Sequence, residues 1–125
     1  MNLRQPGGHK DVVPITGNVT LTNHHVGKVI ITTSDTTNAY TITLPDPDGV
    51  NKGGEIQVLN ESDYVLTITS ATSDKFVAKN NALASSVSLG TTLLMVGGAF
   101  GFFSTGTKWF TKCYCDPGAT VTVSG

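Results

Sequence analysis

The chain has 125 residues and a formal net charge of -1, made up of 8 basic and 9 acidic side chains. This length suits a single domain, and a nearly neutral balance exerts no long-range attraction on nucleic-acid phosphates or anionic membranes. Only 14% of the residues are charged, against about 25% in an ordinary soluble domain. Threonine, serine and asparagine supply the polar character instead. Because threonine favours strands, the composition predicts an all-β protein. The nearly neutral charge predicts that this protein has no nucleic-acid or membrane partner.

The first 14 residues lack any regular alternation of polar and apolar side chains, and they contain Pro6, Gly7, Gly8 and Pro14. We predict an extended arm over residues 1–14 rather than a packed element. The residues after Met1 lack the apolar run of a signal peptide, so we expect synthesis in a cytosol. The arm is followed in this prediction by a single β domain over residues 15–125.

Three strands are predicted after the arm. Residues 18–22 alternate polar and apolar side chains with a period of two, which is typical of a half-buried strand. Residues 28–33 and 41–44 predict two further strands, and Pro45 ends the later one because proline cannot donate a hydrogen bond to a sheet. The prolines, aspartates and glycines of residues 46–54 then predict turns.

A calcium site is the alternative interpretation of this turn region. Asp46 and Asp48 resemble the alternating carboxylates that begin a calcium-binding loop. The twelfth position of such a loop would be Gln57, which is not a bidentate carboxylate. We therefore interpret the segment as a turn and expect no metal ligand in it.

The second half of the chain continues with short alternating segments. Residues 60–63 predict a hairpin connection, Asn80 and Asn81 predict a turn, and the unbroken apolar run 93–96 predicts a strand buried on both faces. No window shows the 3.6-residue period of a helix. We predict an all-β fold, a compact antiparallel sandwich, barrel or prism of about 8–10 short strands. The strands predicted in this half are 55–59, 65–69, 75–77, 86–89, 93–96, 101–104, 108–114 and 119–123.

Histidine and cysteine have the clearest capacity for metal or redox chemistry. His24 and His25 are adjacent, so their side chains point to opposite sides of an extended chain and form a poor zinc site. Cys113 and Cys115 share one face of a strand, but so short a ring strains an intrachain disulfide. We interpret the cysteines as two small apolar residues on a packed face. Interchain pairing and a metal ring on an oligomer axis remain open as alternatives.

The sequence lacks the residue patterns of acid–base catalysis, nucleophilic catalysis and phosphate binding. The acidic side chains fall mostly in predicted turns rather than on facing walls of a cleft, and there is no Gly-x-Ser-x-Gly motif. Gly97, Gly98 and Gly101 lack the Lys-Ser/Thr ending of a phosphate-binding loop. We therefore predict a protein that is not an enzyme and that uses no catalytic residue, metal or cofactor.

Large apolar side chains gather near the end of the chain, where few charges protect the strand edges. Symmetric assembly covers edges and apolar patches together, so we predict a homo-oligomer. The candidates for its core or for the interface between copies are Phe100, Phe102, Phe103 and Trp109.

Four motifs occur in a recognisable order along the middle of the chain. They are Thr-Ile-Thr-Leu-Pro at 41–45, Asn-Lys-Gly-Gly-Glu-Ile-Gln-Val-Leu-Asn at 51–60, Val-Leu-Thr-Ile at 65–68 and Gly-Thr-Lys-Trp-Phe at 106–110. This order resembles the short β-modules of tailed-bacteriophage decoration, head-fibre and tail-fibre proteins. The resemblance covers roughly residues 28–112.

The resemblance implies a structural virion protein that decorates and stabilises a bacteriophage capsid. Its partners would be further copies of itself, in a homotrimer, and the major capsid protein. It would be made in the host cytoplasm and located on the outer capsid surface. The short chain favours a decoration (cement) or short head-fibre protein over a long tail fibre. The arm would lie along seams between capsid subunits, unless it is a terminus without a role, and its candidate contact residues are Arg4, Gln5, His9, Lys10, Val12 and Val13.

Two other functions are compatible with the same sequence. The alternative is a short fibre or a receptor- or glycan-binding β-module of a phage tail or head, in which exposed aromatics such as Tyr40, Tyr64 or Trp109 would stack on sugars. The alternating strand around Trp109 predicts partial burial of its side chain, which disfavours this role. The other function is that of a folding or assembly factor absent from the mature virion.

Overall fold

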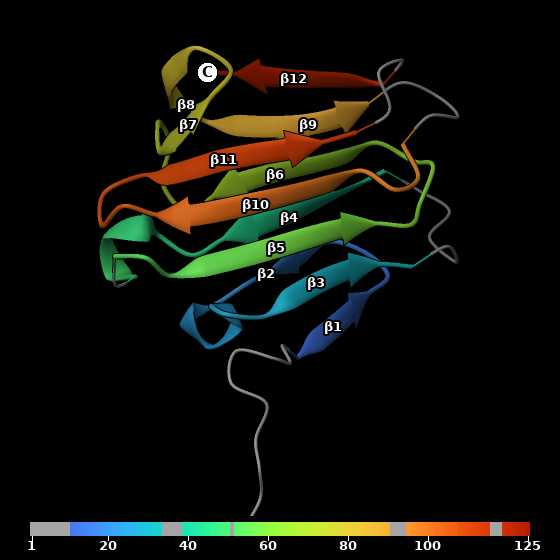
Figure 1. The fold of residues 1–125 in the computed structure, drawn as a ribbon, viewed down its shortest axis with the longest axis horizontal. Helices are drawn as coiled ribbons and strands as arrows, with labels where there is room; N and C mark the ends of the chain where they lie inside the picture. Colours follow the sequence, from blue (N-terminus) through green and yellow to red (C-terminus); the bar gives the residue numbers. More distant parts are fainter. Residues whose placement is uncertain (1–10, 34–38, 51, 91–94, 116–118) are drawn as a thin grey trace, which may run out of the picture.

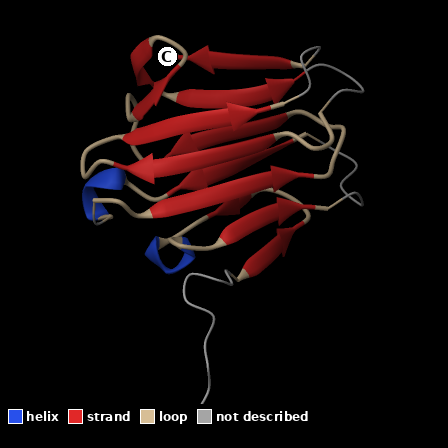
Figure 2. Ribbon diagram, in the orientation of Figure 1, coloured by secondary structure: helices blue, strands red, loops and turns tan. Residues whose placement is uncertain are grey.

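The computed structural model describes residues 11–33, 39–50, 52–90, 95–115 and 119–125. The repeated alternation of apolar and hydroxyl side chains produces strands in these residues, and the strands form two sheets packed as a sandwich (Figure 1). Two short 3-10 turns, η1 (Asn23–His25) and η2 (Pro47–Gly49), accompany the strands (Figure 2). The all-β sandwich predicted from the sequence is confirmed.

The seven-stranded sheet lies nearer to the viewer in Figure 1, and the five-stranded sheet lies behind it. In spatial order, the seven-stranded sheet contains β1 (Val12–Ile15), β3 (Val29–Thr32), β5 (Glu55–Asn60), β10 (Ala99–Ser104), β11 (Trp109–Tyr114), β7 (Phe76–Ala78) and β8 (Asn81–Ala84). The five-stranded sheet contains β12 (Thr120–Ser124), β9 (Ser86–Gly90), β6 (Leu66–Ser70), β4 (Tyr40–Leu44) and β2 (Val19–Thr20). The described residues thus form twelve strands, more than the eight to ten expected.

The first six strands alternate between the two sheets. In one sheet β1, β3 and β5 pair in parallel, and in the other β2, β4 and β6 do the same. Parallel neighbours cannot be joined by a tight hairpin, so each connection crosses to the other sheet and the chain winds around the core. Residues 60–63, expected to form a hairpin connection, instead lead from β5 across to β6 in the opposite sheet.

The later strands pair mainly in the antiparallel sense. β10 pairs with β5 and β11, β9 pairs with β6 and β12, and β7 pairs with β8, all antiparallel, while β7 and β11 are parallel. Lys79 and Asn80 connect β7 to β8 with φ angles of 44° and 67°, the two positive values that a type I′ hairpin turn requires. The predicted turn therefore lies one residue earlier than expected. The sheets are mixed rather than antiparallel, because half of the chain is wound in the parallel sense.

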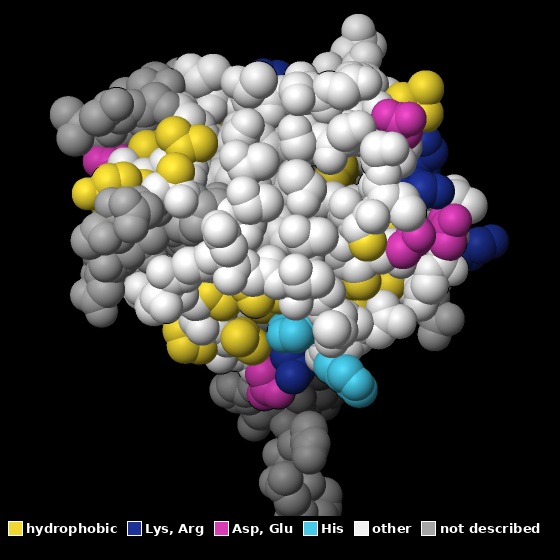
Figure 3. Space-filling view, turned by 180° about the vertical axis from the view of Figure 1, so that it is seen from behind, with side chains coloured by type: hydrophobic (Ala, Val, Ile, Leu, Met, Phe, Trp, Pro, Cys, Tyr) yellow, Lys and Arg dark blue, Asp and Glu magenta, His cyan; other side chains and the backbone are white. Residues whose placement is uncertain are grey.

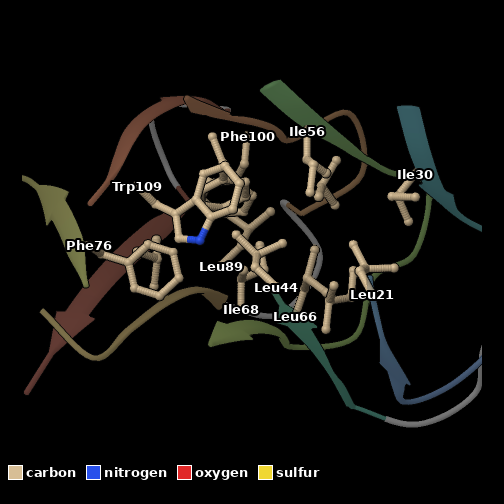
Figure 4. Close-up of a cluster of buried hydrophobic side chains, with 14 of the residues drawn as sticks. Leu21, Ile30, Leu44, Ile56, Leu66, Ile68, Phe76, Leu89, Phe100 and Trp109 are labelled. Atoms are coloured by element: carbon tan, nitrogen blue, oxygen red, sulfur yellow. The ribbon is translucent and has the colours of Figure 1, made fainter. Parts of the chain in front are cut away.

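The inward-facing side chains form one continuous apolar core between the sheets (Figure 4). Phe102 packs edge-on against Phe76 and in a stacked arrangement against Phe100, with ring centroids 5.7 Å apart in both pairs. Trp109 is fully buried, which corrects the expectation of partial burial. Its Nε1 donates a hydrogen bond of 2.9 Å to the Pro45 carbonyl, so the indole N–H keeps a partner away from water.

A buried amide ties three parts of the core together. Asn60 Nδ2 donates to the carbonyls of Ser62 and Met95, both at 2.7 Å, and Asn60 Oδ1 accepts from Thr32 Oγ1 at 2.7 Å. All three bonds are made where water is excluded, so the loss of this side chain would leave buried polar groups without partners. Asn60 therefore anchors the crossing from β5 and the approach to β10.

The strand expected over residues 93–96 is not formed at its described end. Leu93 and Leu94 lie outside the described residues, whereas Met95 and Val96 belong to a loop and turn before β10. Gly97 has a φ of 90°, a left-handed conformation that ends extended structure and that glycine adopts without a steric penalty. Met95 is buried, but Val96 is 61% exposed, so the run is not buried on both faces.

The boundary of the predicted arm also changes. Val12, Val13 and Pro14 belong to β1, which pairs in parallel with β3. The alternation was hard to recognise because the strand has only four residues and contains a proline, which an edge strand such as β1 tolerates. Residues 1–10, the rest of the expected arm, lie outside the described residues.

Candidate functional site

The outer surface of the seven-stranded sheet carries a set of exposed apolar side chains. Phe103 is 46% exposed, Phe110 49% and Tyr114 70%. We call this surface the apolar face and define it by the exposed, outward-facing residues Val12, Leu59, Phe103, Phe110 and Tyr114. Large exposed apolar patches on soluble proteins mark interaction sites, so this face is the candidate functional site.

Strand register aligns these side chains across neighbouring strands. Phe103 on β10 lies directly opposite Phe110 on β11, a placement in which aromatic side chains contact each other. A second row crosses five strands, because Pro14 is level with Ile31, Ile31 with Leu59, Leu59 with Ala99, and Ala99 with Tyr114. The apolar face therefore consists of two aligned groups of side chains on the same side of the sheet, separated by the row that contains Gly101.

The local sequence explains why one sheet is apolar on both sides. Successive residues of a strand point to opposite faces, so two adjacent aromatic residues place one ring inside and one outside. In β10 these are buried Phe102 and exposed Phe103, and in β11 they are buried Trp109 and exposed Phe110. Between the two rows, Gln57 and Lys112 flank Gly101 in register and supply the polar centre of the face.

The size of this surface is appropriate for a protein interface. Seven strands about 4.8 Å apart, with up to six residues rising about 3.3 Å each, give a face of roughly 29 by 20 Å, or roughly 600 Å² in projection. A standard interface buries about 800 Å² of accessible surface on each partner, and accessible surface exceeds its own projection. The outer surface of this sheet, of which the apolar face is a part, is thus comparable in size to one side of a standard interface.

The outer surface of the five-stranded sheet has the opposite character. Its outward side chains are hydroxyls in register across the strands, and none of the described residues in these five strands is charged. Figure 3 views the molecule from this side and shows a broad neutral surface with the charges near its margins. We call it the hydroxyl face, and its residues are Thr20, Thr41, Thr43, Thr67, Thr69, Ser86, Ser88, Thr120, Thr122 and Ser124.

Neighbouring hydroxyls on this face contact each other across the strands. Thr43 Oγ1 lies 3.2 Å from Thr69 Oγ1, and Ser86 Oγ lies 3.2 Å from Ser124 Oγ. Such groups exchange hydrogen bonds with one another and with water, so the face is soluble without any charge. The hydroxyl face therefore has no physical need of a protein partner.

The residues expected at an interface or in the core are divided between the two. Phe100, Phe102 and Trp109 are buried in the core, whereas Phe103 lies on the apolar face. Of the expected arm contacts, Val12 is exposed on β1, and Val13 faces inward and packs against the core. Arg4, Gln5, His9 and Lys10 lie outside the described residues.

The polar residues considered for metal binding take part in local turns. His25 Nδ1 accepts a hydrogen bond from the Thr22 N–H at 3.0 Å and caps η1. Asp46 Oδ1 accepts from the Asp48 N–H at 3.0 Å and caps η2, while Asp48 forms an ion pair of 3.4 Å with Lys75. These are the positions in which such side chains stabilise the ends of short turns.

Within the described ranges, no group of three or more His, Cys, Asp or Glu side chains comes together as a metal site. No helix in the described part of the chain is long and apolar enough to cross a membrane. Cys113 and Cys115 are not in a disulfide, and both are half-buried against the core, as small residues on a packed face would be.

The comparisons with known proteins do not place this chain in a family. No protein-family model matches the sequence, and no curated protein matches it either. The surfaces of the chain itself are therefore the basis for its proposed function.

Sequence reasoning missed most of the apolar face. It singled out Phe103 but not Leu59, Phe110 or Tyr114. The useful signal was the pair of adjacent aromatic residues in each of two predicted strands. A strand with one face exposed to water is expected to alternate apolar and polar side chains, so two adjacent aromatic residues place one ring on the exposed face. Which member of each pair is exposed depends on the position of the opposite sheet.

Proposed function

We propose that the chain is a structural virion protein that decorates and stabilises a bacteriophage capsid as a homotrimer. The observation that carries the proposal is the apolar face, which a subunit of an assembly needs and a solitary protein does not. The motif order at 41–45, 51–60, 65–68 and 106–110 supports the assignment to phage virion β-modules. The proposed role requires no catalytic residue and no cofactor.

Self-association is the proposed use of the apolar face. Burial of Phe103, Phe110 and Tyr114 against another copy removes apolar area from water, which contributes about 25 cal/mol for each Å². The face extends from β1 to β11, so its two ends can contact two different neighbours. Such a head-to-tail contact closes into a ring when the rotation allows it, and three copies form the smallest closed ring of this kind.

Capsid attachment is proposed for the edge of the sheet where the chain enters it. β1 is the edge strand of the seven-stranded sheet and leaves Val12 exposed. The residues before it include Arg4, His9 and Lys10, which carry donors for polar seams between subunits of the major capsid protein. Binding across several subunits would stabilise the shell by mass action, because the trimer binds the assembled state alone.

The first experiment is a molar mass measurement by sedimentation equilibrium. The proposal expects three times the 13.1 kDa of one chain, and a stable monomer at micromolar concentration would contradict it. A second measurement is co-sedimentation with undecorated capsids of a phage that encodes the chain, with and without residues 1–10. Loss of binding on deletion supports the arm as the attachment element, whereas unchanged binding removes it from the mechanism.

A short fibre or a receptor- or glycan-binding module is the second candidate. The burial of Trp109 removes the sugar-stacking residue that the sequence offered for this role, whereas Tyr64 is 43% exposed at the crossing from β5 to β6. A glycan array with Tyr64→Ala as the control variant tests this candidate. Binding that depends on Tyr64 would favour it over the decoration role.

A further inference from the structure

A cavity of about 280 Å³ lies between the two sheets near the end of β11. It forms where β7 pairs only with Trp109 and Phe110 of β11, so β7 covers none of the later residues of that strand. Its lining combines three small apolar side chains with one lysine, one threonine and two cysteines. The lining residues are Ala78, Lys79, Val87, Thr111, Cys113, Cys115 and Val121.

The two thiols of this cavity lie close together. Cys113 and Cys115 are two positions apart at the end of β11, so their side chains lie on the same side of the chain. Burial, followed by the charge and hydrogen bonding of nearby Cys115, raises the pKa of Cys113 to about 12. Cys113 is therefore protonated and a weak nucleophile at neutral pH. A metal ion can still displace such a proton, because thiolate formation is coupled to metal binding.

Lys79 supplies the positive charge at the same place. Its φ of 44° is left-handed, a conformation in which Gly, Asn and Asp are the favoured residues. Its Nζ donates a hydrogen bond of 3.1 Å to the Val121 carbonyl, which holds the ammonium group beside the cavity. Lys79 is also the group whose charge lowers the pKa of Cys113, so the ammonium acts on this thiol.

We propose that Cys113 and Cys115 bind one soft monovalent cation, such as Cu(I), as a two-coordinate dithiolate. Both thiols lose their protons to solvent, two metal–sulfur bonds form, and no electron is transferred. The product carries one negative charge, which the Lys79 ammonium balances within the cavity. Soft thiolate ligands select Cu(I) among cellular metals, and the described residues offer no third or fourth ligand for zinc. This inference is independent of the proposed virion role.

The test is an anaerobic titration of the intact chain with Cu(I) against a chromophoric Cu(I) chelator. We expect one ion per chain, and X-ray absorption at the copper edge should show two sulfur ligands. No binding, a higher sulfur count, or one ion for every two chains would overturn the proposal.

Variants separate a built site from adventitious thiol binding. Cys113→Ser and Cys115→Ser should each abolish binding of one ion per chain, and Lys79→Gln should weaken it about tenfold, the effect of removing an outer partner of a metal site. Lys112→Gln is the matched control, because this lysine faces outward on the same strand. Equal affinity of the Lys79→Gln and Lys112→Gln variants would contradict the role of Lys79. X-ray absorption on the unsubstituted chain tests the ligand set even if a serine variant fails to fold.

Discussion

The two outer faces of the sandwich are built on the same alternation and differ in chemistry. On both sheets the inward residues are apolar and buried. The outward residues of the five-stranded sheet are threonines and serines, whereas those of the seven-stranded sheet include Leu59, Phe103, Phe110 and Tyr114. The hydroxyl face is satisfied by water, and the apolar face is not. The two faces therefore differ in how much apolar area they leave exposed to water.

The largest expected effect comes from placing charge on the apolar face. Phe103→Asp combined with Phe110→Asp removes two apolar contacts worth about 2 kcal/mol each and adds a desolvation cost, so association should weaken by at least roughly a thousandfold. Sedimentation velocity should then show monomers with unchanged circular dichroism. The matched control is Thr67→Asp on the hydroxyl face, which should leave the molar mass unchanged. If the double variant kept its oligomeric state, the apolar face would not be the surface through which copies associate.

The adjacent residues Phe102 and Phe103 compare the two sides of one strand. Phe102→Ala opens a cavity in the core and should lower the free energy of unfolding by about 3–5 kcal/mol. Phe103→Ala should change the stability of the isolated subunit by less than about 1 kcal/mol, because its ring is half-exposed. Urea denaturation at low protein concentration, where the subunit is monomeric, measures both. Similar losses for the two variants would contradict the assignment of Phe103 to a surface.

An apolar group on the hydroxyl face should make the two faces more alike. Thr67→Phe together with Thr43→Phe places two exposed rings among hydroxyls, where an apolar patch promotes association. We expect dynamic light scattering to show particles larger than those of the unsubstituted chain as concentration rises. The control is the pair Thr67→Ser and Thr43→Ser, which keeps the hydroxyls. Unchanged size for the phenylalanine variant would mean that the hydroxyl face is sterically covered.

The smallest effect is expected within the hydroxyl face itself. Thr69→Val removes the 3.2 Å contact with Thr43 Oγ1 but keeps the β-branched shape that favours a strand. Both hydroxyl groups are half-exposed, so water replaces the lost partner and stability should change by no more than about 0.5 kcal/mol. Thermal unfolding monitored by circular dichroism measures this change. A loss above about 2 kcal/mol would mean that hydroxyl pairs hold this sheet together.

The sequence was informative where structure depends on neighbouring residues. The period-two segments at 41–44, 55–59, 65–69 and 86–89 all correspond to observed strands, because alternation and β-branching act within a few residues. Turn chemistry was also readable, as in the Asp46 cap before Pro47. The strand predicted at 93–96 was wrong at its described end, because the apolar side chains were given more weight than the glycine that follows them.

Strand partners could not be derived in the same way. The alternation of 41–44 is the same whether its neighbours are parallel or antiparallel, so nothing local predicts that β4 lies between β2 and β6 in parallel. β1 was missed for a related reason, since four residues with a proline become a strand only through pairing with β3. Pairing is a long-range contact, and its free energy depends on loop closure and on the whole sheet.

The amino-acid sequence alone determined the all-β class, most of the strands and the low fraction of charged residues. It also determined that aromatic residues occupy adjacent positions in β10 and β11. The tertiary structure decided which of each pair is buried, because only the position of the second sheet tells the inner side of a strand from the outer. The apolar face exists for that reason, as does the cavity that places Cys113, Cys115 and Lys79 together.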